Sequence, residues 1–241
     1  MPASLAELHP DVDIDIYSDV VCPWCYIGKR RLEAALAEFD GDVNLTYKPF
    51  QLDPSTPKDA HPLLDWLAPK FGGPERARQL TSHTTQVAAA DGIEMHYDTA
   101  LIANTFTAHR LAWYAARKGA GPAVVEALHR AHFTEGRNIG SVDDLTAIAV
   151  EAGLDEAAVR EFLDSDAGVA EVTAEIQEAY ALGISSVPTF VFAGKYAVSG
   201  AQDPETLLAT LREVQRREGE SVKLQPVGPA GPVCDDDVCE V

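Results

Sequence analysis

The fold is decided by one stretch near the start of the chain, which reads Val12-Asp13-Ile14-Asp15-Ile16-Tyr17-Ser18-Asp19-Val20-Val21-Cys22-Pro23-Trp24-Cys25. Its first six residues alternate apolar and polar side chains, which is the pattern of a strand with one buried face. A helical pattern follows over residues 27–39, and residues 43–47 alternate again. The order strand, helix, strand predicts a parallel βαβ unit with both cysteines at its strand-to-helix turn.

Two cysteines separated by two residues at the start of a helix can close a disulfide across one turn. Only a thiolate attacks a disulfide, and the positive end of a helix stabilises an anion at its first residue. We therefore predict that Cys22 forms a mixed disulfide and that Cys25, one turn inside and less exposed, resolves it. Pro23 suits the first helical position, and Trp24 is expected to offer an exposed aromatic surface to apolar substrate segments.

The same pair has two other interpretations, a buried Cys-x-x-Cys without function and half of a zinc site. A zinc site needs four ligands, and the other cysteines, Cys234 and Cys239, follow a Pro/Gly-rich linker. The seven histidines show no metal-ligand spacing. A Cys-x-x-Cys between a predicted strand and helix is a fairly specific redox signal, so we predict redox chemistry without a metal or a bound cofactor.

The middle of the chain is predicted to be helical, because helical periodicity recurs from about Pro62 to Gly183 without a convincing strand pattern. Strand patterns return at residues 189–192 and 196–198 as a hairpin, followed by a helix over residues 204–217. The predicted fold class is α/β with an all-helical insertion domain. The predicted boundaries are 1–61 and 184–220 for the α/β domain, 62–183 for the insertion and 221–241 for a C-terminal tail.

A second element of the predicted site is Pro188, which directly precedes a strand pattern. Proline is tolerated at the first residue of a strand, and that is the simpler interpretation. The functional interpretation is a cis Val187–Pro188 bond that faces the cysteines. Nearby backbone groups would then be free to hydrogen-bond an extended substrate strand.

Residues 15–28 resemble the active-site region of DsbA-family thioredoxin-fold proteins, specifically of the FrnE-like branch. The resemblance continues through residues 104–111 and 183–190, so it covers nearly the whole chain in the same order. It implies a thioredoxin domain interrupted by a helical domain, and thiol–disulfide exchange on protein substrates with an unidentified electron donor or acceptor. It also implies that Cys22 attacks, that Cys25 resolves and that Pro188 is cis. The family includes oxidases, reductases and isomerases, so the direction of catalysis stays open.

Two further groups of residues lie outside the predicted catalytic pair. Asn104 and His109 lie in the second matching segment, but a lone histidine is more often a hydrogen-bonded structural residue than a catalyst. Some FrnE-like proteins carry a C-terminal Cys-x4-Cys that exchanges with the active site, and Cys234 and Cys239 have this spacing. The linker would allow them to reach Cys22 or Cys25, although an inert local disulfide or an acidic metal-binding tail fits the same residues.

Other functions remain open at this point. Hydroxychromene-carboxylate isomerases and kappa-class glutathione transferases resemble this layout, but they use a single Ser or Cys with a bound thiol cofactor, and two intact cysteines argue against them. A non-catalytic alternative is a redox-sensing or chaperone-like module in which the insertion and Trp24 hold unfolded chains.

The charge of the chain bears on its partners and habitat. The chain has 38 acidic and 19 basic residues, a formal net charge of −19, which disfavours nucleic acid and anionic membranes as partners. The acidic residues are spread along the chain, which favours a protein adapted to concentrated salt. No apolar stretch is long enough to span a bilayer, and Met1–Val12 lack the basic and apolar regions of a signal peptide. We therefore predict a cytoplasmic protein.

Overall fold

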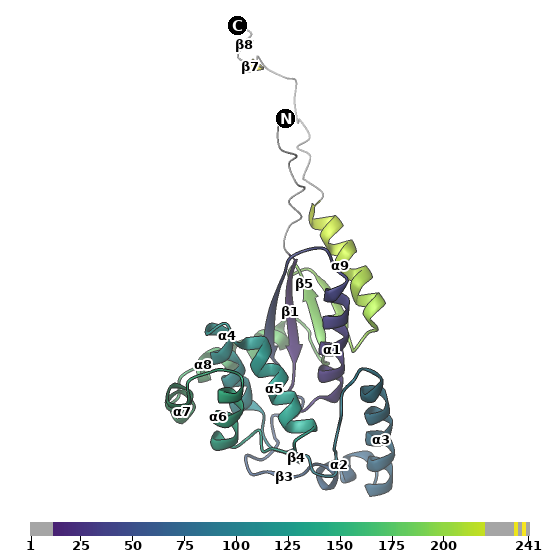
Figure 1. The fold of residues 1–241 in the computed structure, drawn as a ribbon, viewed down its shortest axis with the longest axis vertical. Coiled ribbons are helices and arrows are strands. Elements are labelled where there is room, and N and C mark those ends of the chain that lie inside the picture. Colours follow the sequence, from purple (N-terminus) through teal and green to yellow (C-terminus); the bar gives the residue numbers. More distant parts are fainter. Residues whose placement is uncertain (1–11, 220–233, 236–237, 240–241) are drawn as a thin grey trace.

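The computed structural model describes residues 12–219, 234–235 and 238–239. Its centre is a four-stranded sheet with the strand order β2-β1-β5-β6 (Figure 1). The pairing of β1 with β2 is parallel, and the pairings of β5 with β1 and of β6 with β5 are antiparallel. The predicted βαβ unit and the late hairpin are therefore confirmed. The strands are β1 (Val12–Ser18), β2 (Val43–Pro49), β5 (Thr189–Phe192) and β6 (Tyr196–Ser199).

Two helices, α1 (Pro23–Ala37) and α9 (Pro204–Gly219), lie side by side against the sheet (Figure 1). The alternation predicted for β1 is real, because Ile14 and Ile16 are buried while Asp13 is exposed. Each fully buried aliphatic or aromatic side chain of this core contributes about 1.5–3 kcal/mol to stability. The core also contains Leu32, Phe190, Phe192, Leu207 and Leu211.

The segment between β2 and β5 is largely helical, as predicted. Its α4 to α7 enclose a core of their own, which also takes in Val20 from the loop before the cysteines. Two of these helices begin with a side-chain cap: Ser141 accepts a hydrogen bond from the Asp144 N–H, and Asp155 accepts one from the Ala158 N–H. The helices are α2 (Leu63–Phe71), α3 (Pro74–Ala90), α4 (Phe106–Arg117), α5 (Gly121–Phe133), α6 (Val142–Glu151), α7 (Glu156–Asp164) and α8 (Val169–Ala181).

This segment is not all-helical, and in that detail the prediction is wrong. Two short strands, β3 (His61–Pro62) and β4 (Leu101–Ile102), pair antiparallel. β3 precedes α2 and β4 follows α3, so the pair closes the base of the α2–α3 hairpin. A strand of two residues contains no full alternation, and for this reason the hydrophobic pattern did not reveal it.

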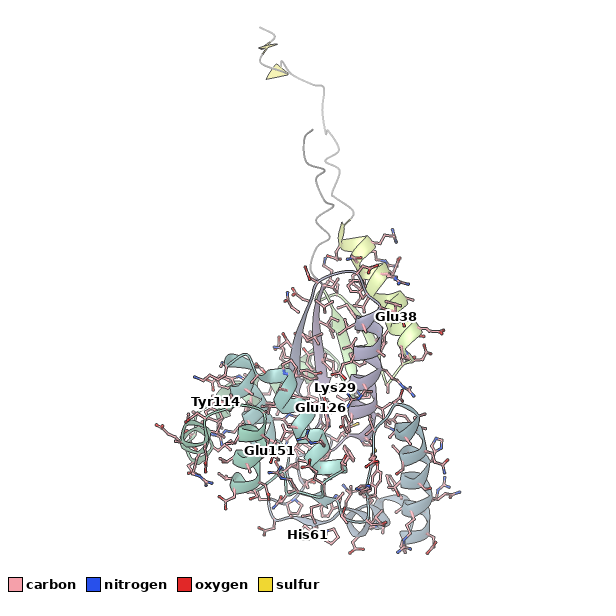
Figure 2. The ribbon with its side chains drawn as sticks, viewed as in Figure 1. Lys29, Glu38, His61, Tyr114, Glu126 and Glu151 are labelled. Carbon is pink, nitrogen blue, oxygen red and sulfur yellow. The ribbon has the colours of Figure 1, made fainter. Side chains whose placement is uncertain are left out.

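The first helix is joined to the insertion by a partly buried charge cluster. The Lys29 ammonium lies 2.6 Å from the Glu126 carboxylate on α5 (Figure 2), and the Tyr26 hydroxyl donates to the same carboxylate at 3.0 Å. Burial acts to raise the pKa of Glu126, but the contacts with Lys29 and the neighbouring Arg30 outweigh it and keep this pKa below its usual value. The cluster therefore holds a charged pair at the junction between α1 and α5.

The remaining described residues form a short ladder in the C-terminal tail. β7 (Cys234–Asp235) and β8 (Val238–Cys239) pair antiparallel, with Cys234 opposite Cys239 in the register. Within the part of the chain that the structure describes, no helix has the length and apolar character needed to cross a bilayer.

Candidate active site

Cys22 and Cys25 lie at the start of α1, where the sequence predicted them. Cys22 is the residue that caps the helix, and its carbonyl accepts a hydrogen bond from the Cys25 N–H at 3.0 Å. Pro23 occupies the first turn, where the lack of an N–H costs nothing. Both cysteines are free thiols, so the structure shows the reduced, dithiol form of the pair.

The two cysteines differ in what they face rather than in how much they are exposed. Both are buried, Cys22 with 4% and Cys25 with 3% of its surface exposed, so the expected difference in exposure is small. However, Cys22 lines a pocket of about 590 Å³ and Cys25 does not. Burial is the main reason that the pKa of the Cys25 thiol is raised well above its usual range; Cys22 raises this pKa further, while the Ser18 hydroxyl opposes the rise. Cys25 is therefore held as a neutral thiol behind Cys22.

The pocket in front of Cys22 is bounded by both halves of the fold. Trp24 and Val187 belong to the sheet domain, whereas α2 and α3 supply most of the apolar wall. Trp24 is 38% exposed, as expected, and its binding of apolar substrate segments stays a prediction. The volume lies in the range of sites that enclose a small ligand or several side chains of a peptide. The apolar wall residues of the hairpin are Leu63, Trp66, Leu67, Phe71 and Leu80.

The loop before β5 meets the cysteines directly. The Val187–Pro188 peptide bond is cis, and the Cys22 Sγ lies 3.7 Å from the Val187 carbonyl oxygen as a weak donor. The fold therefore brings the Val187–Pro188 loop and the cysteine motif together, although these two segments are far apart in the sequence.

Gly28 is a site residue that the sequence analysis missed. A Cβ at this position of α1 would lie 2.9 Å from the Pro188 Cγ and 3.3 Å from the Phe190 ring. Only glycine therefore allows the proline loop to pack directly on the helix that carries the cysteines. The glycine was visible in the motif, but no local signal indicated what it packs against.

Asp19 is a second residue that the sequence analysis quoted without a role. Its side chain is 1% exposed, and its carboxylate accepts a hydrogen bond from the Leu52 N–H at 2.8 Å. His109 Nε2 lies 3.2 Å from the other carboxylate oxygen, and the Asp19 backbone carbonyl accepts from the Cys22 N–H at 3.0 Å. The predicted residue His109 thus contacts the loop that ends in Cys22.

Asn104 fixes the neighbouring loop and does not line the pocket. Its side-chain amide donates to the carbonyls of Pro54 and Thr56, and its oxygen accepts from Gln51 at 3.1 Å and from the Phe106 N–H at 3.0 Å. Because the amide uses both its donor and acceptor sides, Asn104 connects the start of α4 to the loop after β2.

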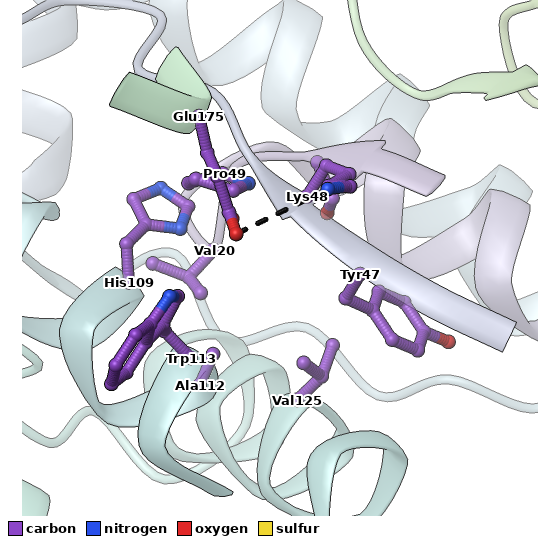
Figure 3. A pocket seen from close by; sticks show the side chains of 10 residues that line it. Val20, Tyr47, Lys48, Pro49, His109, Ala112, Trp113, Val125 and Glu175 are labelled. Atoms are coloured by element: carbon purple, nitrogen blue, oxygen red, sulfur yellow. Dashed lines mark ion pairs between the residues drawn. The ribbon is translucent and has the colours of Figure 1, made fainter. Parts of the chain in front are cut away.

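His109 also lines a small cavity, which is separate from the pocket in front of Cys22 (Figure 3). It measures about 20 Å³, enough for one water molecule. Trp113 and Val20 also line it, together with the Lys48–Glu175 ion pair, whose charged atoms are 4.0 Å apart. Burial is the first reason that the pKa of Glu175 is raised.

The remaining predicted group is the Cys234/Cys239 pair of the tail. The side chains of Cys234 and Cys239 lie outside the described parts of the structure, so their exchange with the active site stays a prediction. Across residues 12–219 and the two short tail strands, no group of three or more His, Cys, Asp or Glu side chains is arranged to hold a metal ion.

The whole α/β fold, with its helical insertion, matches a known protein family. Residues 13–212 match the model of the DSBA-like thioredoxin domain family. The chain belongs to this family. A DSBA-like thioredoxin domain accounts for the fold observed here, including the sheet and the helical segment between its halves.

Three similar proteins match this chain over most of its length. A crystal structure described as a probable DsbA oxidoreductase from Streptomyces coelicolor is 36% identical, with a TM-score of 0.81, over 95% of this chain and 99% of that chain. The uncharacterized protein YwbO of Bacillus subtilis (strain 168) is 27% identical over 209 residues, which are 86% of this chain and 99% of YwbO. A 2-hydroxychromene-2-carboxylate isomerase is 18% identical with a TM-score of 0.63, over 86% of this chain and 98% of that chain, and this likeness concerns the fold alone.

Proposed function

We propose that this DSBA-like protein exchanges thiols and disulfides in protein substrates, with Cys22 as the attacking and Cys25 as the resolving residue. One observation carries the proposal: Cys22 lines the pocket, whereas Cys25 lies behind it as a buried thiol of raised pKa. Two free cysteines in this arrangement suit a dithiol mechanism, which the single-nucleophile isomerases and transferases of the same fold do not need.

In the reductive direction, the Cys22 thiolate attacks one sulfur of a client disulfide. The client S–S bond breaks, a mixed disulfide forms, and the other client sulfur leaves as a thiolate. Cys25 then loses its proton and attacks the Cys22 sulfur, which releases the second client thiolate. The enzyme pair is oxidised by two electrons and the client is reduced by two, and the reverse sequence oxidises a client dithiol.

The pocket suggests how a client is held. An extended client segment beside Pro188 would use backbone hydrogen bonds, and its apolar side chains would enter the wall formed by Trp24 and the α2–α3 hairpin. Val187, whose carbonyl already contacts Cys22, would lie at the centre of this contact.

Three further parts of the proposal rest on the sequence. The protein works in the cytoplasm with an unidentified electron donor or acceptor, without nucleic acid or membrane as partners. The Cys234/Cys239 pair exchanges with the active site. Truncation after Gly231 should therefore shift the rate or the midpoint at which the Cys22–Cys25 pair is oxidised in a redox buffer, and identical curves would remove the tail from the mechanism.

The proposed activity is tested with insulin as the client and dithiothreitol as the reductant. Wild-type protein should accelerate the reduction, and Cys22→Ser should not. Retained activity in Cys22→Ser would show that the dithiol mechanism is wrong. Refolding of scrambled ribonuclease, measured in parallel, separates an isomerase from a reductase, and protection of unfolded insulin chains by Cys22→Ser without turnover would support the binding-module alternative.

A further inference from the structure

The contact between His109 and Asp19 links two parts of the chain with different tasks. His109 is on α4 of the helical insertion, and Asp19 is in the loop between β1 and the cysteines. Both side chains are buried, with 5% and 1% of their surfaces exposed, and they meet at 3.2 Å. A buried carboxylate is costly unless its oxygens accept hydrogen bonds, so the partner of each oxygen matters.

The position of Asp19 determines where Cys22 begins the helix. One oxygen of the Asp19 carboxylate accepts a hydrogen bond from the Leu52 N–H. The other oxygen contacts His109 Nε2. The backbone carbonyl of Asp19 accepts the hydrogen bond of the Cys22 N–H. The residues from Asp19 to Cys22 therefore form a turn whose first residue is held by Leu52 and by the insertion residue His109, and whose last residue is the nucleophile.

Other charged groups near Asp19 do not replace this contact. His132 on α5 is close enough for the charge of Asp19 to act on it, but burial lowers the pKa of His132 to about 4. His132 is therefore uncharged near pH 7. The Cys25 thiol meets the backbone of Asp19 rather than its carboxylate, and burial keeps this thiol neutral.

We propose that His109 is a positioning residue of the redox reaction: through Asp19 it holds the turn that places Cys22 where Cys25 closes the disulfide. A disulfide forms only within narrow limits of sulfur distance and dihedral angle. Misplacement of a reacting group by about 1 Å can cost about 100-fold in rate. The insertion thus contributes to the chemistry at the cysteines as well as to the pocket wall, and this inference rests on the proposed dithiol function.

The test compares two replacements at position 109. His109→Leu removes the polar contact with a side chain of similar size, whereas His109→Gln keeps an N–H that can donate to Asp19. The size matters because His109 borders the small cavity of Figure 3, which a shorter side chain would enlarge. His109→Phe keeps a ring, lacks the contact as well, and is interpreted in the same way should His109→Leu fail to fold.

A matched control is the next residue of the same helix. The Arg110 guanidinium donates to the Phe162 carbonyl at 3.0 Å and to the Ala167 carbonyl at 2.8 Å, far from the cysteines in the chain and in contact with α7 and the loop after it. Arg110→Met should lower the melting temperature of the insertion without changing the turn at Asp19.

The measured quantity is the effective concentration of Cys25 toward Cys22, obtained from the ratio of Cys22–glutathione mixed disulfide to Cys22–Cys25 disulfide in glutathione buffers. His109→Leu should lower it about 10-fold or more, His109→Gln should restore most of the loss, and Arg110→Met should leave it unchanged. A folded His109→Leu protein with the wild-type effective concentration would overturn the inference. If wild-type protein formed neither species, the proposed function itself would fail instead.

Discussion

Helix α5 and the α2–α3 hairpin belong to the same insertion, but they are attached to the molecule in different ways. Nine residues of α5 are buried, whereas the only buried residue of α2 is Leu63 and α3 has three, Ala77, Thr81 and Ala88. Four apolar side chains of the hairpin that are not fully buried line the pocket in front of Cys22 instead: Trp66, Leu67, Phe71 and Leu80.

This difference suggests a division of labour within the insertion. The α4–α7 core supports the loop that carries Asp19 and Val20, so its packing fixes the geometry of the cysteines. The hairpin contributes few buried contacts and keeps its apolar surface for a client. Regions with little buried surface open at a lower free-energy cost than well-packed ones. We therefore expect mutations in α5 to affect stability and mutations in the hairpin to affect client binding.

The largest expected effect is on stability, from Leu128→Ala in α5. Leu128 is fully buried, and truncation of such a leucine costs about 2–5 kcal/mol because it leaves a cavity. The matched change Leu67→Ala in α2, at a half-buried pocket residue, should cost less than about 1 kcal/mol. The measurement is the free energy of unfolding in urea. Equal losses of unfolding free energy in the two variants would show that α5 and the α2–α3 hairpin do not differ in their contribution to stability.

The second effect is acid sensitivity of the packed region. Burial lowers the pKa of His129 to about 3 and that of His132 to about 4, so the folded protein keeps both rings neutral. Between these values and about 6.5 the unfolded chain binds more protons than the folded one, so stability is fully present above pH 6.5 and falls as the pH is lowered toward 4. The loss for one such histidine is of the order of 3 kcal/mol.

Unfolding free energies of wild type and His132→Leu across this range test the acid effect. The variant should lose less stability between pH 6.5 and pH 4 than the wild type. The matched replacement of the exposed His83 in α3, His83→Leu, should leave the acid dependence as it is. Parallel curves for wild type and His132→Leu would contradict the assignment of the effect to α5.

The smallest effect is on binding. Trp66 lines the pocket from α2, and Trp66→Ala should raise the KM for insulin about 10-fold, or about 1.4 kcal/mol, without lowering kcat. The control is Val150→Ala, which removes an exposed apolar side chain from α6, away from the pocket. A fall in kcat with unchanged KM for Trp66→Ala would place the hairpin in the chemical step and not in binding.

The sequence predicted those parts of the fold that have a local pattern. The alternation of β1 and the cysteines before α1 each follow from a few neighbouring residues, and the structure confirms both. The pairing of β3 with β4 had no such pattern, because each strand is two residues long.

The sequence predicted the cysteines and the proline loop of the candidate site. It did not predict how the residues around them contact one another. Asp19 stood in the quoted motif, but its partner His109 is 90 residues away in the sequence, and no local rule connects them. Gly28 matters only because Pro188 packs on it, which again requires the three-dimensional arrangement. The sequence predicted that α2 and α3 are helices, but it did not predict that they form one side of the pocket.

Trapping of the mixed disulfide shows which cysteine attacks, because Cys22 is proposed to attack and Cys25 to resolve. A peptide disulfide is incubated with Cys25→Ser and, separately, with Cys22→Ser, and the adducts are located by digestion and mass spectrometry at low pH, which separates Cys22 and Cys25 from Cys234 and Cys239. We expect a stable adduct of one peptide on Cys22 in Cys25→Ser, and little or none on Cys25 in Cys22→Ser. An adduct that forms faster on Cys25 of the Cys22→Ser protein would contradict this proposal.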